Sequence, residues 1–425
     1  MARISVLLLL FGACALCPST ANGQAMAPIL SLLFNSLQQQ VKIARQRQGV
    51  DFIVPEPPPN LLEQCRLARL QSCETHFVQT PDGYILELHH IPPATAGAIP
   101  VLVLHGNFGT SDGFLMRTDQ PNLATSLHEA GYDVWLGNWR GSFRSKRHVR
   151  LNSSDPAFYN FSMQDIGGID VPTFIDFILD RTGQPSLHLI SHSMGCPVTL
   201  IALSTRPEYN AKVRFAALMA PVIWPRNTLQ VLATLLFDVF SNELRAFMNL
   251  TKLWNLIPRS AFFHNLGDLM CRDNSPLIET CWWGFELIFG KSHPSQRMKE
   301  FIPSVLATHP AGSTFNIQTQ YAVFSITGRF RPLGKGIRDP QPPPDYNLTA
   351  ITTPVGLYYG ATDATMAVKD MVRLERALPV LEDSYLVPLK HFSHFDFLTA
   401  TDGRSVLYDR IIQKMKTADY RTTYD

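Results

Sequence analysis

A serine in a strand-to-helix turn is the strongest chemical signal in the sequence. The hydrophobic segment 187–190 runs into 191–195, which reads Ser-His-Ser-Met-Gly, and then into the apolar segment 197–203. A small-x-Ser-x-Gly pattern between a strand and a helix is typical of a nucleophile elbow, a sharp turn that lifts the serine hydroxyl above a sheet. We therefore predict Ser193 as a nucleophile. Ser191 stands where glycine is usual and adds one hydroxymethyl group to a crowded turn.

A serine hydroxyl is a poor nucleophile at neutral pH, so it needs an imidazole to take its proton and a carboxylate to orient that imidazole. In hydrolases with this elbow the three residues follow in the order Ser, Asp, His. Asp363 follows the apolar run 355–359, and His394 follows the last apolar run. We predict His394 as the base and Asp363 as its acid. His391 and Asp370 remain alternatives at this stage.

Acyl transfer also needs two N–H donors for the negative oxygen of its tetrahedral intermediate. One donor is expected from the residue after the nucleophile, Met194. The other is expected from the loop after the apolar run 101–104, where we assign the backbone N–H of Asn107. His105 in that loop and His192 beside the nucleophile are interpreted as structural hydrogen-bonding groups.

The elements that would position these residues form a repeating pattern. Short apolar runs alternate with helical patterns, which is typical of buried parallel strands in a doubly wound α/β sheet. These runs are 101–104, 133–136, 187–190, 215–219, 355–359 and 385–387. Before them, 76–79 and 84–91 flank a Pro-Asp-Gly turn and predict a β-hairpin. The apolar residues between 171 and 179 recur with the spacing of a helix that lies on a sheet.

This alternation fails between residues 221 and 310, where the pattern is helical and rich in Trp and Phe. We predict an inserted helical cap there, with most of its aromatic side chains packed inward and some facing what the cap covers. The core would then comprise 76–220 and 311–425, preceded by an N-terminal wrap at 24–75.

The chain begins with features of a secretory signal. A short basic start precedes an apolar stretch, 4–16, that is shorter than the roughly 20 residues of a spanning helix. Ala21 and Gly23 suit cleavage before Gln24, so 1–23 is predicted to be a signal peptide; the weaker alternative is an N-terminal membrane anchor. No later segment predicts a transmembrane helix.

The cysteines fit an oxidising compartment. Two of the seven lie in the signal segment, and the spacing of the others favours two local disulfides, Cys65 with Cys73 and Cys271 with Cys281. Cys196 is left over and is interpreted as a buried thiol. Four Asn-x-Ser/Thr sequons are candidate glycosylation sites: Asn152, Asn160, Asn249 and Asn347.

The composition excludes several classes of protein. Hydrophobic residues make up 45% of the chain and charged residues 17%, so disorder and coiled coils are excluded. With 37 basic and 35 acidic residues, the net charge of +2 does not favour nucleic-acid binding. The sequence lacks H-E-x-x-H, C-x-x-C among the remaining cysteines and a G-x-G-x-x-G after a strand, so we predict neither a metal nor a cofactor.

With these residues identified, the chain resembles the acid lipase family, which includes gastric lipase, lysosomal acid lipase and insect lipase-3-like enzymes. The resemblance runs from about Cys73 to Leu398. Its most specific segments are 80–86 (TPDGYIL), 130–138 (AGYDVWLGN), 140–141 (RG), 175–178 (IDFI) and 309–313 (HPAGS).

The resemblance implies an α/β-hydrolase fold with a triad at Ser193, Asp363 and His394. It also implies a helical cap with a lid and a cap disulfide matching Cys271 and Cys281. The chain departs from the family pattern at four positions, which bear on substrate preference more than on chemistry: Ser191 for glycine, Met194 for a frequent glutamine, Asn107 for an aliphatic residue, and Trp139 in a small-residue context.

The expectation is therefore a secreted or lysosomal serine lipase that acts at a lipid–water interface on esters of neutral lipids, acylglycerols first and steryl esters second. A soluble carboxylesterase would share every catalytic residue but prefer short esters. A noncatalytic lipid-binding protein on the same fold is the alternative from another class, and the intact triad argues against it.

Overall fold

The computed structural model describes residues 60–228, 230–259, 265, 267, 270–298 and 300–424. The predicted signal peptide, the membrane-anchor alternative and the part of the N-terminal wrap before residue 60 lie outside the described residues. Across the described ranges, no helix combines the length and the apolar character that a membrane crossing needs.

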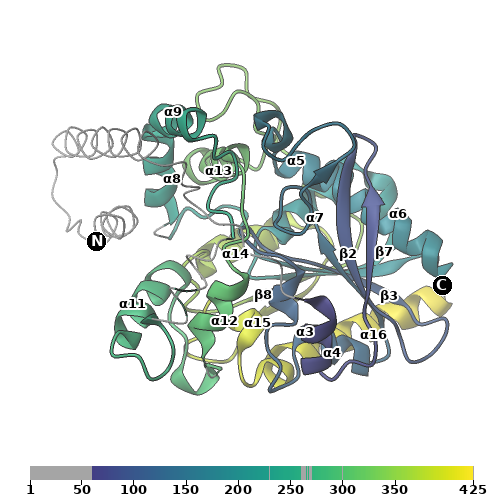
Figure 1. Ribbon diagram of the computed structural model, residues 1–425. Coiled ribbons are helices and arrows are strands. Elements are labelled where there is room, and N and C mark those ends of the chain that lie inside the picture. Colours follow the sequence, from purple (N-terminus) through teal and green to yellow (C-terminus); the bar gives the residue numbers. More distant parts are fainter. Residues whose placement is uncertain are drawn as a thin grey trace.

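A nine-stranded, mostly parallel sheet forms the centre of the molecule (Figure 1). Its order is β1-β2-β4-β3-β6-β7-β8-β9, with β5 paired to β2. The pairs β1/β2, β2/β4 and β2/β5 are antiparallel, and all pairs from β4 to β9 are parallel. The strands are β1 Glu74–Gln79, β2 Tyr84–Ile91, β3 Pro100–Leu104, β4 Asp133–Asn138, β5 Arg147–His148, β6 Leu187–His192, β7 Val213–Met219, β8 Val355–Tyr359 and β9 Leu381–Leu386.

Five of the six predicted core strands coincide with β3, β4, β6, β7 and β8, whose apolar runs are buried on both faces. The sixth prediction, 385–387, was misplaced, because β9 begins at Leu381 and ends at Leu386. As the edge strand, β9 alternates between buried Asp383 and exposed Ser384. An edge strand of this kind lacks the continuous apolar run of a central one.

The predicted hairpin is β1 and β2, paired in register from Glu74 opposite His90 to Gln79 opposite Ile85. Its turn is closed by the Thr80 hydroxyl, which donates to Asp82 at 2.6 Å. Gly83 adopts a φ of +108°, which favours glycine.

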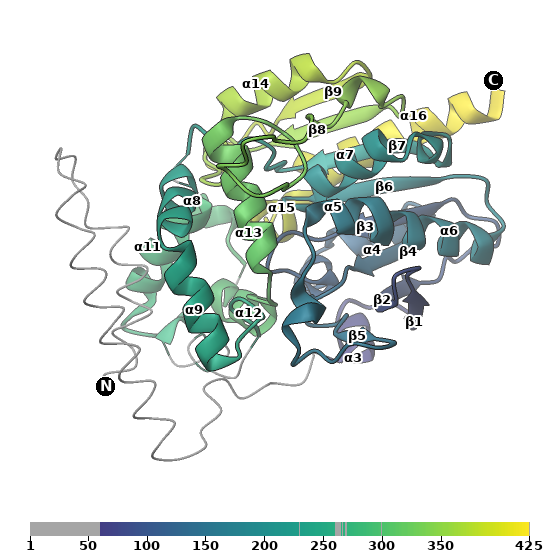
Figure 2. The same cartoon turned by 90° about the horizontal axis from the view of Figure 1, so that it is seen from above.

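Helices cover both faces of the sheet, so the fold has three layers (Figure 2). One apolar core packs α6 Val171–Thr182, α7 Gly195–Thr205 and α14 Val368–Ala377 against one face. The second packs α3 Leu61–Leu67, α4 Leu123–Glu129 and α16 Asp409–Tyr424 against the other. The helix predicted from the periodicity of 171–179 is α6.

Between β7 and β8 the chain leaves the sheet and forms a group of helices beside it (Figure 1). They are α8 Gln230–Val239, α9 Ser241–Thr251, α11 Ile278–Phe289 and α12 Phe301–Thr308. After residue 310, α13 Phe315–Ala322 packs against α8, so the helical layer continues past the predicted end of the cap.

Aromatic contacts hold this helical layer together. Trp282 stacks on Phe301 with ring centroids 5.3 Å apart, and Phe285 is buried. Trp283, by contrast, is 59% exposed.

The two predicted disulfides are present, joining Cys65 to Cys73 and Cys271 to Cys281.

Candidate active site

The turn that carries Ser193 has the geometry of a nucleophile elbow. Strand β6 ends at His192, Ser193 follows with a φ of +56°, and α7 begins at Gly195. The Ser193 N–H donates to the Met219 carbonyl on the neighbouring strand at 2.9 Å. A Cβ on Gly195 would lie 2.9 Å from two carbonyl oxygens of the β3 end, so only glycine fits there.

Ser191 is accommodated by a partner that the sequence did not reveal. Its hydroxyl lies 2.5 Å from the Thr199 hydroxyl, and both residues are fully buried. This pair ties β6 to the second turn of α7. The extra hydroxyl at the usual glycine position is therefore buried with a hydrogen-bond partner.

The structure brings Ser193, His394 and Asp363 together as a hydrogen-bonded triad. The His394 Nε2 lies 2.8 Å from Ser193 Oγ, and the His394 Nδ1 lies 2.8 Å from Asp363 Oδ2. The three residues are 8%, 4% and 7% exposed. Because a carboxylate only accepts, Nδ1 carries the proton, and Nε2 is left to accept from the serine hydroxyl.

Asp370 and His391, the alternatives for the acid and the base, are not part of this hydrogen-bonded triad. Asp370 accepts from the side chain of Asn227 and from the backbone N–H of Ala367 at the start of α14. His391 is half-buried, and its Nδ1 has no hydrogen-bond partner among the described residues.

Thr365 joins the triad, and the sequence reasoning missed it. Its hydroxyl lies 2.7 Å from Asp363 Oδ1 and 2.8 Å from His394 Nδ1, and its N–H donates to the same carboxylate oxygen at 2.8 Å. The single hydroxyl proton goes to the carboxylate, so the hydroxyl oxygen can only accept from Nδ1–H. Thr365 thus favours the same tautomer as Asp363. Asp-x-Thr is a common local motif in which the carboxylate accepts hydrogen bonds from the residue two positions later. It is the sequence pattern from which the contact of Thr365 with Asp363 could have been predicted.

A segment of the cap is attached directly to the triad loops. We call residues 289–292, which begin at the last residue of α11, the strap. The Phe289 carbonyl accepts from the His394 N–H at 3.0 Å and from the Ala364 N–H at 3.3 Å. Gly290 forms a β-bridge with Asp363 at a φ of +97°, and a Cβ there would lie 1.9 Å from the Thr362 carbonyl oxygen.

The strap also holds the loop that precedes α15 Asp396–Thr399. The Ser292 hydroxyl donates to Asp396 Oδ1 at 2.7 Å, and Asp396 Oδ2 accepts from the Ser393 N–H at 2.6 Å. Burial raises the pKa of Asp396 to about 6, against the lowering effect of these hydrogen bonds. No local sequence pattern signals the strap, because its partners lie between 71 and 104 residues away in the chain for the side-chain contacts.

The loop predicted to supply an oxyanion donor lies against the nucleophile. A Cβ on Gly106 would be 2.8 Å from Ser193 Cβ, so this loop can approach only with glycine there. Asn107 follows, half-buried. Within the described part of the chain, the backbone N–H groups of Asn107 and Met194 have no protein acceptor.

The chain after the cap braces this loop. We call residues 309–311 the brace. The Ala311 N–H donates to the Phe108 carbonyl at 2.6 Å, and a Cβ on Gly109 would lie 3.0 Å from His309 Nε2. Two segments from the C-terminal part of the cap, the strap and the brace, therefore contact loops that surround Ser193.

The neighbouring histidines make structural contacts. His105 Nδ1 donates to the Gly106 carbonyl at 2.8 Å, and burial lowers the pKa of His105 to about 3. His192 Nε2 donates to the His394 carbonyl at 3.1 Å, and burial holds its pKa well below the usual value. Cys196 is an unpaired, buried thiol whose pKa burial raises well above its ordinary value.

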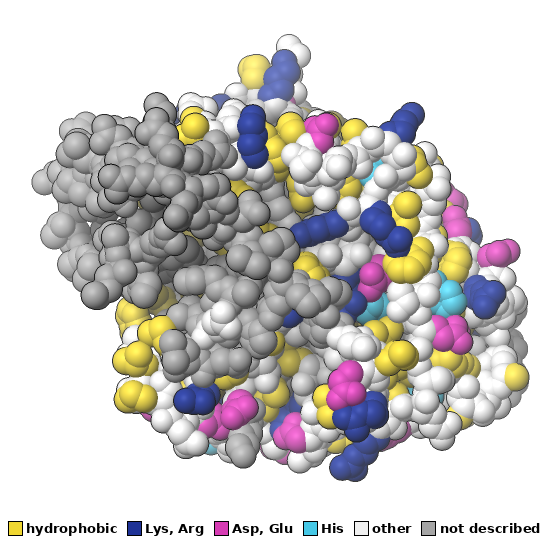
Figure 3. Space-filling model, viewed as in Figure 1, with side chains coloured by type: hydrophobic (Ala, Val, Ile, Leu, Met, Phe, Trp, Pro, Cys, Tyr) yellow, Lys and Arg dark blue, Asp and Glu magenta, His cyan; other side chains and the backbone are white. Residues whose placement is uncertain are grey.

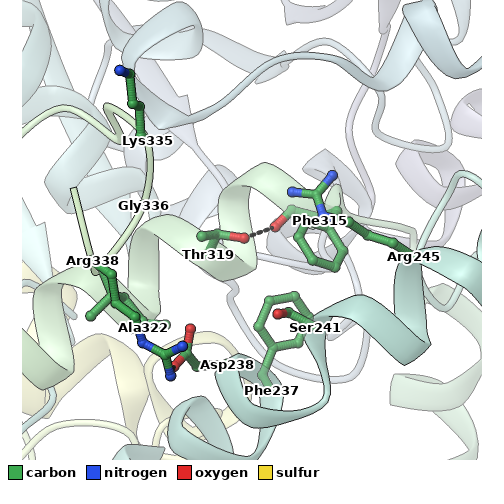
Figure 4. Close-up of a pocket in the computed structure, with 11 residues that line it drawn as sticks. Phe237, Asp238, Ser241, Arg245, Phe315, Thr319, Ala322, Lys335, Gly336 and Arg338 are labelled. Carbon is green, nitrogen blue, oxygen red and sulfur yellow. Dashed lines mark hydrogen bonds and ion pairs between the residues drawn. The ribbon is translucent and has the colours of Figure 1, made fainter. Parts of the chain in front are cut away.

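A separate cavity of about 200 Å³ lies between α8, α9 and α13 (Figure 4). Arg245 lies 3.7 Å over the ring of Phe315 on its wall, and Arg338 pairs with Asp238 at 3.2 Å. The triad residues are not among those that line it. This cavity is therefore distinct from the space above Ser193.

Comparison with known proteins defines the class first. Residues 99–401 match the family model for the alpha/beta hydrolase fold, and residues 71–118 match a partial alpha/beta-hydrolase lipase region. The chain therefore belongs to the alpha/beta-hydrolase fold family, as the sequence predicted.

Within that family, the resemblance to acid lipases is confirmed. The chain is 35% identical to Drosophila melanogaster Lipase 3 over 355 residues, which cover 81% of this chain and 90% of that protein. It is 29% identical to Bos taurus gastric triacylglycerol lipase over 80% of this chain and 87% of the relative. A Crotalus adamanteus protein assigned as a lysosomal acid lipase/cholesteryl ester hydrolase is 29% identical over 92% of this chain and 98% of that protein.

The solved structures agree on the fold. One from Sulfolobus solfataricus superimposes with a TM-score of 0.53 at 14% identity, covering 78% of this chain and 90% of that chain.

Proposed function

We propose that the protein is a serine lipase that hydrolyses carboxylic esters of neutral lipids, acylglycerols first and steryl esters second. The observation that carries this proposal is the continuous hydrogen-bonded path from Ser193 Oγ through His394 to Asp363, with both links at 2.8 Å. The names of the relatives, which include gastric triacylglycerol lipase, support the substrate class.

In the first half-reaction, Ser193 Oγ attacks the ester carbonyl carbon and gives its proton to His394 Nε2. The carbonyl electron pair moves onto oxygen, and the N–H groups of Asn107 and Met194 stabilise that negative charge. The intermediate then collapses, the ester C–O bond breaks, and His394 returns the proton to the leaving alcohol. Asp363 keeps the imidazole oriented and stabilises its protonated form.

In the second half-reaction, water gives a proton to His394 Nε2 and attacks the acyl-Ser193 carbonyl. The fatty acid leaves, and Ser193 recovers its proton. No cofactor takes part in either half-reaction as proposed.

The cap would supply the contact with lipid. Apolar side chains gather on the part of the surface over α11 (Figure 3), and Trp283 and Leu277 are among the exposed ones. Val239 and Leu235 of α8 are exposed as well. Exposed apolar groups of this kind suit a lipid–water interface, and each CH₂ of an acyl chain buried beneath a cap contributes about 0.8 kcal/mol.

We also propose a secretory route, to the cell exterior or the lysosome, with 1–23 removed as a signal peptide. Two disulfides support an oxidising compartment. The four predicted glycosylation sites, Asn152, Asn160, Asn249 and Asn347, are all exposed, as a glycan requires.

Two measurements test the function. A fluorophosphonate probe should label the wild type and the control Ser405→Ala, which changes an exposed serine, but not Ser193→Ala. Purified protein should also hydrolyse emulsified trioleoylglycerol faster than a dissolved short-chain ester. Preference for the short ester with no effect of emulsification would make the protein a soluble carboxylesterase, and a folded wild type that is not labelled would contradict both enzyme proposals.

A further inference from the structure

A second group of side chains that could take part in chemistry lies on β1 and β2. These strands form the edge of the sheet opposite β9. Glu74 and His76 of β1 point to the same face because they are two residues apart on a strand. His90 of β2 is directly opposite Glu74 in the register. Figure 2 shows β1 and β2 at the edge of the sheet, and β2, β4 and β3 separate β1 from the strand that carries the elbow.

The spacing of their donor atoms is that of a metal site. Glu74 Oε2 lies 3.1 Å from His76 Nε2 and 3.3 Å from His90 Nδ1, and all three atoms lie within 4.8 Å of one another. A tetrahedral zinc ion with bonds of about 2.0–2.1 Å separates its ligands by about 3.3 Å. The two spacings from Glu74 fit this value, and a small rotation of one imidazole would bring the two histidine nitrogens to the same spacing.

The orientation of His90 supports a cation at this position. Its Nε2 donates to Asp133 Oδ1 at 2.6 Å, and the Asp133 carboxylate is nearly buried. Nε2 is therefore occupied by a proton, and Nδ1 is the nitrogen that faces the oxygen of Glu74. A carboxylate that accepts from the outer nitrogen of a histidine is the usual support of a metal-binding imidazole.

The surrounding residues hold these groups in place. Trp135 stacks on the His90 ring with centroids 3.8 Å apart and an angle of 7°, and its Nε1–H donates to Asp133 Oδ2 at 2.8 Å. The His76 ring lies 5.2 Å from that of Trp135. The disulfide of Cys73 anchors the backbone just before Glu74. The Glu74 side chain is 49% exposed, so an ion can reach the group from solvent.

We propose that Glu74, His76 and His90 bind one divalent transition-metal ion, with zinc as the preferred ion and water in the remaining position. Two imidazoles and one carboxylate suit zinc better than calcium or magnesium, which prefer oxygen ligands. The ion would fasten the edge strand β1 to β2. This site is independent of the proposed lipase chemistry.

Zinc binding to the chelator-stripped full-length protein tests the proposal by equilibrium dialysis. We expect one zinc ion per chain in the wild type, lost in Glu74→Gln, in His76→Phe and in His90→Phe, where the aromatic ring preserves the packing. The control His293→Gln, which changes an exposed histidine after α11, should bind like the wild type. Asp133→Asn should weaken binding by at least about tenfold.

A wild type that binds no zinc would overturn the proposal and leave only the side-chain contacts of His90 with Glu74 and Asp133. Unchanged stoichiometry and affinity in the three variants would overturn it as well. X-ray absorption of the zinc-loaded wild type decides the question even if a variant fails to fold. We expect two imidazole nitrogens in the coordination shell, and a shell without histidine would contradict the assignment.

Discussion

The core and the cap position the triad in different ways. Ser193 is fixed by the sheet itself, through a backbone bond to β7, a left-handed φ and glycine contacts that admit no side chain. The cap contacts the loops around the triad through two segments of its second half, the strap beside His394 and the brace beside Phe108. The core therefore prepares the nucleophile, while the cap completes the position of the base and provides the apolar surface.

The core buries His105, and this burial should make the free energy of unfolding strongly dependent on pH. Burial lowers the pKa of His105 to about 3, against about 6.5 in an unfolded chain. Above pH 6.5 the imidazole is neutral in both the folded and the unfolded chain, so its burial costs nothing. Between pH 6.5 and about 3 only the unfolded chain binds the proton, so the free energy of unfolding falls as the pH falls. The shift corresponds to a loss on the order of 5 kcal/mol. We expect the free energy of unfolding, measured with urea at several pH values, to fall more steeply with acid in the wild type than in His105→Gln; equal slopes would contradict this.

The next effect tests the strap. Gly290→Ala places a Cβ against the Thr362 carbonyl at an unfavourable φ, so the strap must shift away from Asp363 and His394. We expect kcat to fall by about 100-fold, because a misplaced catalytic group is costly. Gly284→Ala on α11 is the matched control, since its Cβ would meet nothing within 4 Å. If both variants hydrolyse esters at the wild-type rate, the strap does not position the base.

A smaller effect on kcat is expected at Thr365, which contacts Asp363 and His394 from a loop of the core and does not involve the cap. Thr365→Val removes the hydroxyl shared by Asp363 and His394 and keeps the shape. We expect kcat to fall about tenfold with KM unchanged, which is about 1.4 kcal/mol, and Thr365→Ser to restore it. The Nδ1 proton of His394 should shift in the NMR spectrum of the valine variant. A change confined to KM would argue against this positioning role.

The smallest effect tests the cap surface. Trp283→Ser removes a large exposed apolar group from α11. We expect hydrolysis of emulsified trioleoylglycerol to fall about threefold, because the free energy of apolar contact with the interface is reduced, while a dissolved short-chain ester is hydrolysed as before. Leu67→Ser, an exposed apolar change on α3, is the control. Equal losses on both substrates would show that Trp283 acts on the catalytic site instead.

The sequence predicted those parts of the molecule whose signals are local. The apolar runs predicted five central strands. The elbow was predicted from the apolar strand before Ser193 and the glycine and apolar helix after it. The order of Asp363 and His394 after their strands placed both side chains beside the elbow. The edge strand β9 was misplaced because only Asp383 of its residues is buried, so it lacks a continuous apolar run.

The parts that could not be predicted depend on contacts between distant segments. The strap joins Phe289 to His394, and no spacing in the chain signals that contact. Glu74 and His90 meet only through the register of two strands, so no contiguous metal motif exists for them. The fit of Ser191 is a more local case, because it depends on the hydroxyl of Thr199, eight residues further along the chain in the next element.

The proposed reaction depends on attack by Ser193 on an ester whose carbonyl oxygen is then held by two backbone N–H groups. A crystal structure of the protein after reaction with an alkyl phosphonate tests this directly. We predict phosphorus bonded to Ser193 Oγ, with its oxygen about 2.7–3.1 Å from the N–H groups of Asn107 and Met194. A phosphonate attached to another residue, or an oxygen that points away from both N–H groups, would contradict this mechanism.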